Sequence, residues 1–174
     1  MIILADAVDV AIRVGVPEDS GLIHKHLAAC PIVPVASPDY IRRYGAPQTP
    51  RDLRNHRMIA YALHGGVSEW KYKDKNGKIG VFRSEGVFRA NTAEMMLQAA
   101  LDSVGIALLP LFSAHGYVQS KQLIRILPDC TTEPVRTIFA LAPPNRYRAA
   151  KVRLFLDWLA QACKAMPWEI DPDV

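Results

Sequence analysis

Short apolar segments alternate with helix signals along the chain, and this alternation constrains the fold more than any other feature. Residues 8–14 (VDVAIRV) and 136–142 (RTIFALA) are apolar and contain β-branched residues, as buried strands do. Residues 93–102 (AEMMLQAALD) and 148–165 carry apolar residues at helical spacing. Strands and helices interleaved in one chain predict an α/β fold rather than an all-α or all-β one.

Helix starts and turns can be located from capping residues. Ser37 followed by Pro38 predicts a helix over 38–44 that ends at Gly45. By the same reasoning Thr49 caps a short helical turn reaching residue 55, and Asn91 or Thr92 caps the helix over 93–102. A hairpin is predicted around 74–77 (DKNG), because Asn-Gly between strand-like residues favours a tight turn.

The remaining segments are shorter. Residues 22–29 fit either a short helix or an extended segment. Residues 31–36 (PIVPVA) contain two prolines, which argue against a helix and favour an edge or connecting strand. The polar residues 167–174 are expected to form a frayed tail. Further strands are predicted over 58–63, 84–89, 106–109 and 122–127, and a short helix over 111–117.

The charge is mildly basic, with a net charge of +4 and a pI near 9.1. The basic residues are dispersed, whereas a DNA-binding domain gathers them on one element. Aromatic and basic residues interleave from Trp70 to Lys78, as in a nucleic-acid-binding stripe, but a hairpin with outward lysines explains the same pattern. Trp70 and Trp158 are predicted to be packing residues. We expect no DNA contact from this chain itself.

The sequence offers little support for a metal centre or an exported protein. The three cysteines, Cys30, Cys130 and Cys163, are widely spaced, so neither a disulfide scaffold nor a metal cluster is predicted. His24 and His26 form an HxH pair without a patterned third ligand. The first sixteen residues lack an export signal, and no apolar run is long enough to cross a membrane. We therefore expect a cytoplasmic protein without a cofactor.

No pattern in the chain predicts an enzyme. The sequence lacks GxSxG, HExxH and Walker-type motifs. His64, Gly65 and Gly66 are suggestive of an oxyanion loop, but no nucleophile motif follows them. We therefore predict a binding protein rather than a catalyst.

Several ordered motifs resemble the substrate-binding (effector-binding) domain of LysR-type transcriptional regulators. They are DVAIRVG at 9–15, PVASPDYIRRYGAPQTPRDLRNH at 34–56, GIALLP at 105–110 and KVRLFLDWLA at 151–160. The resemblance covers residues 5–162, nearly the whole chain. It departs from the family in lacking the winged helix-turn-helix, the linker helix and the opening of the first lobe.

The resemblance implies a two-lobed fold like that of type 2 periplasmic binding proteins, here with an incomplete first lobe. Residues 1–36 and 137–166 would form the first lobe and residues 37–136 the second. Connecting strands would lie near 33–36 and 137–142. A small effector, a carboxylate in many family members, would bind in the cleft between the lobes. DNA would be bound only through a domain absent from this chain, in a homodimer or homotetramer.

Two kinds of observation nominate ligand-binding residues. Asn91 and Thr92 precede the clearest helix, whose free N–H groups and dipole attract anions, and Ser37 with Pro38 begins another. Gly15, Val16 and Ile106 are added by family position alone. Each has an ordinary structural explanation as well: the polar residues cap helices, and the others form turns or core.

Three alternatives to an effector-sensing domain remain at this point. A stand-alone solute-binding protein of the same fold would need an export signal, and an enzyme on this fold would need a catalytic constellation. A truncated, non-functional remnant is the third. Neither the effector nor the target genes follow from the sequence.

Overall fold

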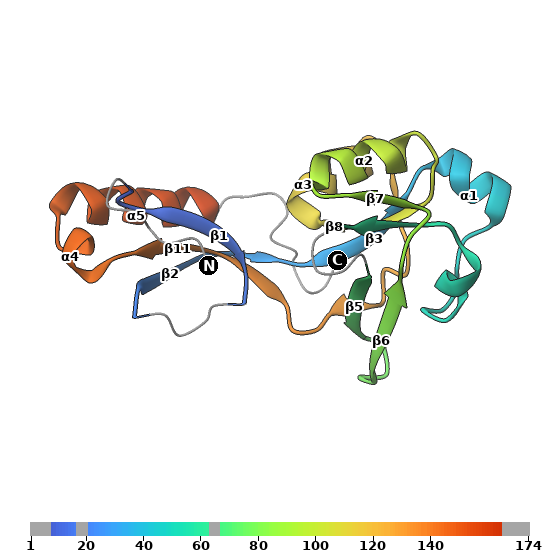
Figure 1. Cartoon of the computed structure of the whole chain (residues 1–174), viewed down its shortest axis with the longest axis horizontal. Coiled ribbons are helices and arrows are strands. Elements are labelled where there is room, and N and C mark those ends of the chain that lie inside the picture. Colours follow the sequence, from blue (N-terminus) through green and yellow to red (C-terminus); the bar gives the residue numbers. More distant parts are fainter. Residues whose placement is uncertain (1–7, 17–20, 63–66, 165–174) are drawn as a thin grey trace. The chain divides into compact units, whose positions relative to one another are not determined.

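A computed structural model describes residues 8–16, 21–62 and 67–164, and within them the chain forms two compact units. Unit 1 combines the residues up to Cys30 with those from Val135 onward, and unit 2 runs from Pro31 to Pro134. Unit 2 is therefore one continuous segment inserted between the two pieces of unit 1 (Figure 1). The expected tail at 167–174 and the loop at 64–66 lie outside the described residues.

Unit 1 is built on an antiparallel sheet whose middle strand comes last in the sequence. The strand order is β1-β11-β2. Residues 22–29, which the sequence allowed to be either a short helix or an extended segment, are extended: residues 23–29 belong to strand β2. The strands are β1 (Ala11–Gly15), β2 (Ile23–Cys30) and β11 (Arg136–Ala142).

Helix α5 (Ala150–Cys163) covers this sheet and follows the short helix α4 (Pro144–Tyr147). Its buried side, with Val152 and Leu156, packs on apolar residues of β2 and β11. The prediction that Trp158 is a packing residue is wrong, since it is 63% exposed; Phe155 is 46% exposed. Both lie away from the side of the helix that faces the sheet. The helices within the described ranges fall short of the length and apolarity needed to cross a bilayer.

Unit 2 contains a five-stranded sheet with the order β7-β4-β8-β3-β9. β4 runs parallel to both β7 and β8, whereas β3 runs antiparallel to β8 and β9. The strand predicted over 122–127 is only two residues long, and Leu127 cannot belong to it because its positive φ of 51° is not allowed in an extended strand. The strands are β3 (Ile32–Ala36), β4 (Met58–Tyr61), β7 (Phe88–Ala90), β8 (Ile106–Pro110) and β9 (Ile124–Arg125).

The proline-containing strand β3 lies inside this sheet, although the sequence favoured an edge or connecting strand. Proline is tolerated because β9 pairs only with Val35 and Ala36. Pro34 needs no N–H here, and its carbonyl oxygen accepts a hydrogen bond from the Ile126 N–H at 2.8 Å.

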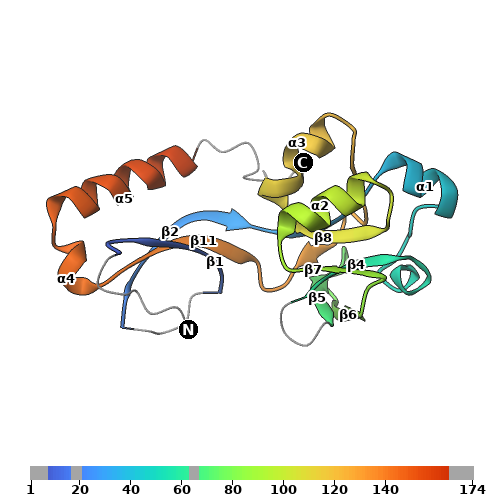
Figure 2. The same cartoon turned by 45° about the horizontal axis from the view of Figure 1, so that its top comes forward.

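Helices α2 (Ala93–Leu101) and α3 (Leu111–Gln119) pack together on one face of the five-stranded sheet (Figures 1 and 2). The core on the other face joins helix α1 (Pro38–Tyr44), the 3-10 turn η1 (Asp52–Asn55) and a second, three-stranded sheet. That sheet has the order β10-β5-β6, with β5 (Ser68–Lys73), β6 (Ile79–Ser84) and β10 (Thr131–Thr132).

The predicted hairpin is confirmed as β5 and β6. The Asp74 carboxylate accepts hydrogen bonds from the N–H groups of Asn76 and Lys78, which fixes the turn. Trp70 is 2% exposed, and its indole N–H donates to the Thr132 hydroxyl, as its predicted packing role requires. The aromatic side chains of β5 face the core, so they do not form a nucleic-acid stripe with the lysines.

Two of the three predicted helix caps are confirmed. Ser37 Oγ accepts from the Tyr40 N–H at 3.1 Å, and Thr92 Oγ1 accepts from the Met95 N–H at 3.3 Å. The prediction for Thr49 is wrong. Asp52 supplies the carboxylate, which accepts from the Thr49 N–H at 2.8 Å, so the side chain reaches back to the backbone that precedes it.

Candidate functional site

The predicted ligand-binding residues of unit 2 lie at opposite edges of the five-stranded sheet. β4, β7 and β8 are parallel and all end at one edge, which we call the carboxyl edge. Asn91 and Thr92 follow β7 at this edge. Ser37 and Pro38 follow β3, which runs the other way, and Ile106 begins β8. These two groups are separated by the length of a five-residue strand, about 16 Å.

At the carboxyl edge, two helices begin close to the ends of strands. Thr92 adopts an extended conformation and caps α2 with its hydroxyl, which leaves the N–H groups of Ala93 and Glu94 in the exposed first turn. α3 begins directly after β8, and the Leu111 N–H donates to the Pro31 carbonyl at 2.9 Å. Two positive helix ends therefore share this edge.

Sequence reasoning missed two contributors to the carboxyl edge. Tyr61 ends β4 and is 39% exposed, and its strand is joined to β7 by the Ala62 N–H donating to the Ala90 carbonyl at 2.7 Å. Pro31 and Ile32 arrive at the same edge, since Ile32 pairs with Pro110. The parallel pairing of β4 with β7 and β8 and the antiparallel pairing of β3 with β8 bring these segments together, and no local pattern in the sequence predicts these pairings.

At the opposite edge, Ser37 and Ile106 are part of the core. Ser37 is 3% exposed, and its hydroxyl shares a 2.8 Å hydrogen bond with Ser103 besides capping α1. Ile106 is fully buried, and its N–H donates to the Arg57 carbonyl at 2.8 Å. These contacts give Ser37 and Ile106 structural roles in the core. A ligand-binding role for Ser37, Pro38 and Ile106 stays a prediction.

Gly15 and Val16 belong to unit 1. Gly15 is the last residue of β1, and its carbonyl accepts a hydrogen bond from Thr137 Oγ1 at 3.3 Å. Val16 follows the strand and is 57% exposed. Gly15 would tolerate a side chain, since a Cβ built on it meets nothing within 4 Å. The structure brings neither residue into a described pocket.

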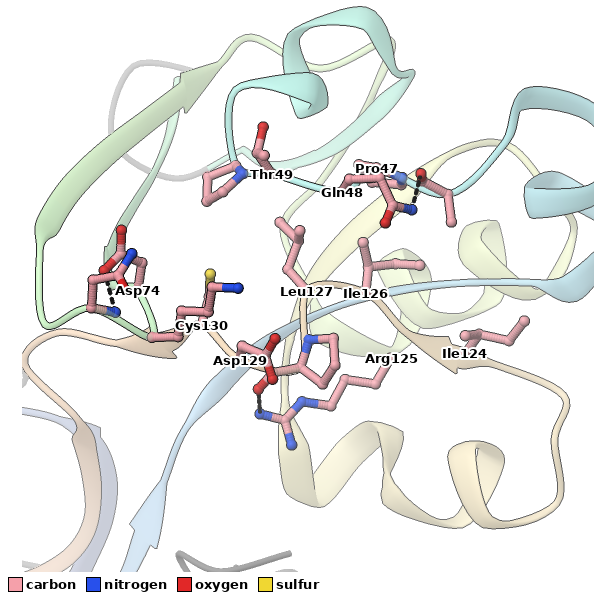
Figure 3. Close-up of a pocket in the computed structure, with 15 residues that line it drawn as sticks. Pro47, Gln48, Thr49, Asp74, Ile124, Arg125, Ile126, Leu127, Asp129 and Cys130 are labelled. Carbon is pink, nitrogen blue, oxygen red and sulfur yellow. Dashed lines mark hydrogen bonds between the residues drawn. The ribbon is translucent and has the colours of Figure 1, made fainter.

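A hollow of about 500 Å³ lies within unit 2, away from all the predicted site residues (Figure 3). Figure 3 shows Pro47, Gln48 and Thr49 on one side of it and Leu127 and Cys130 on another. Its lining consists of residues 46–50, the hairpin turn 74–76 and residues 124–130.

The chemistry of this hollow is mixed. Burial lowers the pKa of Arg125 and raises the pKa of the Cys130 thiol, so the thiol stays protonated at neutral pH. Arg125 donates to the Pro128 carbonyl at 3.1 Å, while its buried Nε has no hydrogen-bond partner. Asp74 and Asp129 add acidic groups. Because both charge signs line it, the hollow does not select one class of ligand.

Neither a metal site nor a catalytic group emerges from the part of the chain that the structure describes. No three His, Cys, Asp or Glu side chains gather there as metal ligands would. His24 stacks on Phe139 with ring centroids 5.7 Å apart. Burial raises the pKa of the Cys30 thiol to about 11, which makes it a poor nucleophile.

Comparison with known proteins identifies the family. The model of the LysR substrate binding domain matches residues 2–164. The chain belongs to this family. It is 34% identical over 164 residues to YhjC, an uncharacterized HTH-type transcriptional regulator of Escherichia coli, covering 93% of this chain and 54% of YhjC. It is 28% identical over 154 residues to the HTH-type transcriptional regulator CrgA of Neisseria meningitidis, covering 88% of this chain and 51% of CrgA.

Solved structures of LysR-type regulators share the fold. The CrgA regulatory domain matches with a TM-score of 0.78 and 27% identity, covering 90% of this chain and 76% of that domain. The full-length Vibrio cholerae virulence activator AphB matches with a TM-score of 0.75 and 26% identity, covering 88% of this chain and 51% of AphB.

These matches establish the fold class and the family of homologues. LysR regulatory domains have the two-lobed, type 2 periplasmic-binding-like α/β fold that the sequence predicted. The homologues are transcriptional regulators and not enzymes. The chain spans about half the length of the curated LysR-type relatives it matches.

Proposed function

We propose that this chain is the effector-sensing part of a bacterial LysR-type transcriptional regulator that acts in the cytoplasm. The observation that carries the proposal is the family match over residues 2–164. In the proposed regulator, DNA is bound by a helix-turn-helix domain outside this chain, and the protein works as a homodimer or homotetramer. Effector binding favours one arrangement of the domain and shifts the population toward it.

The carboxyl edge of unit 2 is the best-supported location for the effector. Ligands of open α/β sheets bind beyond the carboxyl ends of parallel strands. Here Asn91 and Thr92 lie at such an edge, beside the positive starts of α2 and α3. Exposed N–H groups and two helix dipoles suit a small carboxylate. In the proposed site, Tyr61 supplies an aromatic wall.

Ser37 and Thr92 provide a matched pair of variants for testing this location. Each hydroxyl caps a helix, but only Thr92 lies at the carboxyl edge. Thr92→Ala and Ser37→Ala should both lower the melting temperature of the full-length regulator, each by the loss of about 1 kcal/mol of capping. Only Thr92→Ala should also reduce the response to an effector.

The experiment measures thermal melting of the full-length regulator with a panel of aliphatic and aromatic mono- and dicarboxylates. We expect at least one compound to raise the melting temperature of the wild type and of Ser37→Ala, and to raise that of Thr92→Ala much less. An effector to which all three proteins respond equally would remove the carboxyl edge as its site. A wider metabolite panel without any response would count against effector sensing itself.

A further inference from the structure

The turn between β5 and β6 contains a chemically reactive pair of residues, Asn76 and Gly77. The side-chain carbonyl carbon of an asparagine can be attacked by the backbone nitrogen of the next residue, and this makes asparagine one of the thermolabile residues of proteins. A side chain on the next residue hinders the attack, whereas glycine has no side chain. Of the four asparagines in the sequence, Asn76 alone is followed by glycine.

The hairpin presents both residues to solvent. Asn76 and Gly77 are exposed, and the Asn76 backbone N–H donates to the Asp74 carboxylate at 2.9 Å. The side-chain amide of Asn76, in contrast, has no hydrogen-bond partner among the described residues. A Cβ built on Gly77 would meet a single atom within 4 Å, so the space around this peptide is open. The Asn76 side chain can therefore rotate toward the Gly77 nitrogen.

A positive charge lies beside the attacking nitrogen. The Cβ built on Gly77 would lie 3.8 Å from Cε of Lys73, whose ammonium group is the next atom along that side chain. The nitrogen must lose its proton before it attacks, and a nearby cation favours the negatively charged form of a group. The Asp74 carboxylate opposes this effect, but it accepts hydrogen bonds from the N–H groups of Asn76 and Lys78, which draw on its negative charge.

One hydrogen bond keeps the attacking nitrogen in the closed turn. The Gly77 N–H donates to the Asp74 carbonyl oxygen at 2.9 Å. The nitrogen reacts only when this bond is open, and exposed turns open locally at a small cost in free energy. Opening of the turn is therefore the step that admits the reaction.

We propose that Asn76 is a site of spontaneous covalent modification, which converts it through a cyclic imide into aspartate and isoaspartate. The Gly77 nitrogen bonds to Cγ of Asn76, the Cγ–Nδ2 bond breaks, and ammonia leaves with the proton that the nitrogen gave up. Water then opens the ring, at Cγ to give aspartate or at the backbone carbonyl carbon to give isoaspartate. One water is consumed and one ammonia released, without an oxidant or a reductant. The reaction needs neither an effector nor DNA, so it stands apart from the proposed function.

The modification changes the hairpin in two ways. Either product adds a carboxylate close to Asp74, at the rim of the hollow in unit 2, and lowers the net charge from +4 to +3. Isoaspartate also lengthens the main chain by one carbon between the N–H groups of residues 76 and 78. The Asp74 carboxylate, which accepts from both groups in the unmodified turn, no longer matches their spacing. We therefore expect the isoaspartate form to have a looser β5–β6 turn.

Mass spectrometry of the aged protein tests the site. The 174-residue chain is incubated at physiological temperature in a mildly alkaline buffer, digested, and analysed by tandem mass spectrometry, with an isoaspartyl methyltransferase to label isoaspartate. Asn55, Asn91 and Asn145 are internal controls, because they are also exposed but are followed by residues with side chains. Asn76 should convert about tenfold faster than each of them, or more. Equal rates at the four asparagines would overturn the proposal.

A matched pair of variants tests the contribution of the folded turn. Lys73→Gln and Lys71→Gln each remove one positive charge from an exposed position of β5, but only Lys73 lies beside Gly77. Lys73→Gln should slow the conversion about two- to fivefold, the effect expected of one exposed charge at short range, and Lys71→Gln should leave it unchanged. In urea, where this geometry is lost, the two variants should react equally fast. Equal rates in the folded proteins would show that Lys73 does not act on the turn.

Thermal melting of the separated products tests the consequence for the hairpin. Ion-exchange chromatography separates the modified forms, and circular dichroism follows their unfolding. The isoaspartate form should melt at a lower temperature than Asn76→Asp, which is the matched control because it carries the same charge on an ordinary main chain. Identical melting of the two would refute the predicted loosening of the turn.

Discussion

Replacement of Gly105 by alanine should destabilise unit 2 strongly. Gly105 is buried just before β8, and a Cβ built on it would lie 2.2 Å from the Arg57 carbonyl oxygen and 2.9 Å from its carbonyl carbon. Real Cβ contacts of this length do not occur, so the Arg57 peptide must move. Arg57 is held on both sides: its carbonyl oxygen accepts from the Ile106 N–H, and its own N–H, in the preceding peptide group, donates to the Tyr40 hydroxyl at 2.9 Å.

The magnitude follows from what the movement breaks. Overpacking a well-packed core costs about 1–3 kcal/mol. Leaving a buried hydrogen-bonding group unpaired costs about 1–3 kcal/mol more. A total loss of about 2–6 kcal/mol from the free energy of unfolding is a large share of the stability of an ordinary domain, roughly 5–15 kcal/mol.

Gly116→Ala is the matched control for this prediction. Gly116 lies in α3, and a Cβ there meets nothing within 4 Å. Alanine in a helix interior is more favourable than glycine by about 0.5–1 kcal/mol, so this variant should be slightly more stable than the wild type. Urea unfolding followed by circular dichroism measures both. If the free energy of unfolding of Gly105→Ala lies within about 0.5 kcal/mol of the wild-type value, the Arg57 backbone can move at little cost, and the reasoning is refuted.

Three further predictions concern stability. Leu156→Ala in α5 should cost about 2–5 kcal/mol, because Leu156 is 1% exposed; Leu154→Ala, at 70% exposure, should change urea stability by less than about 0.5 kcal/mol. Ser37→Thr should retain the urea midpoint that Ser37→Ala loses. Hydrogen bonds from the backbone N–H and the side chain of Thr49 hold the pKa of Asp52 below its usual 3.8, so its stabilisation is present above about pH 4 and is lost as the pH falls through the folded-state pKa. Acid unfolding of Asp52→Asn should lack that part of the pH dependence; an unchanged acid profile would contradict it.

Elements encoded by local residues could be predicted from the sequence. The helix over 38–44 begins and ends as its capping residues indicate, because a cap involves neighbours only. The hairpin at 74–77 is fixed in the same way by Asp74 and its turn. The Thr49 cap was predicted wrongly because the side-chain hydrogen bonds here run the other way: the Asp52 carboxylate accepts from the N–H groups of Gln48 and Thr49.

Features that depend on long-range pairing could not be predicted. Asn91 and Ser37 looked equivalent as helix starts, yet parallel pairing of β4 and β8 and antiparallel pairing of β3 place them at opposite edges. Phe155 and Trp158 lie in the predicted helix, but the sequence of a helix does not show how much of its surface the underlying sheet covers, and both side chains are exposed. The contribution of Tyr61 to the carboxyl edge likewise depends on which strands become neighbours.

The place of β11 in the sheet has a consequence for biosynthesis. β1 and β2 do not touch as strands; each pairs with β11, which is made about a hundred residues later. At roughly 5–20 residues per second, the ribosome leaves both strands without their partner for about 5–20 s. Unit 2, a continuous segment, can fold in that interval. In the nascent chain, β1 and β2 therefore remain unpaired until β11 is made. Any delay in synthesis before residue 136 prolongs the time during which these unpaired strands can aggregate.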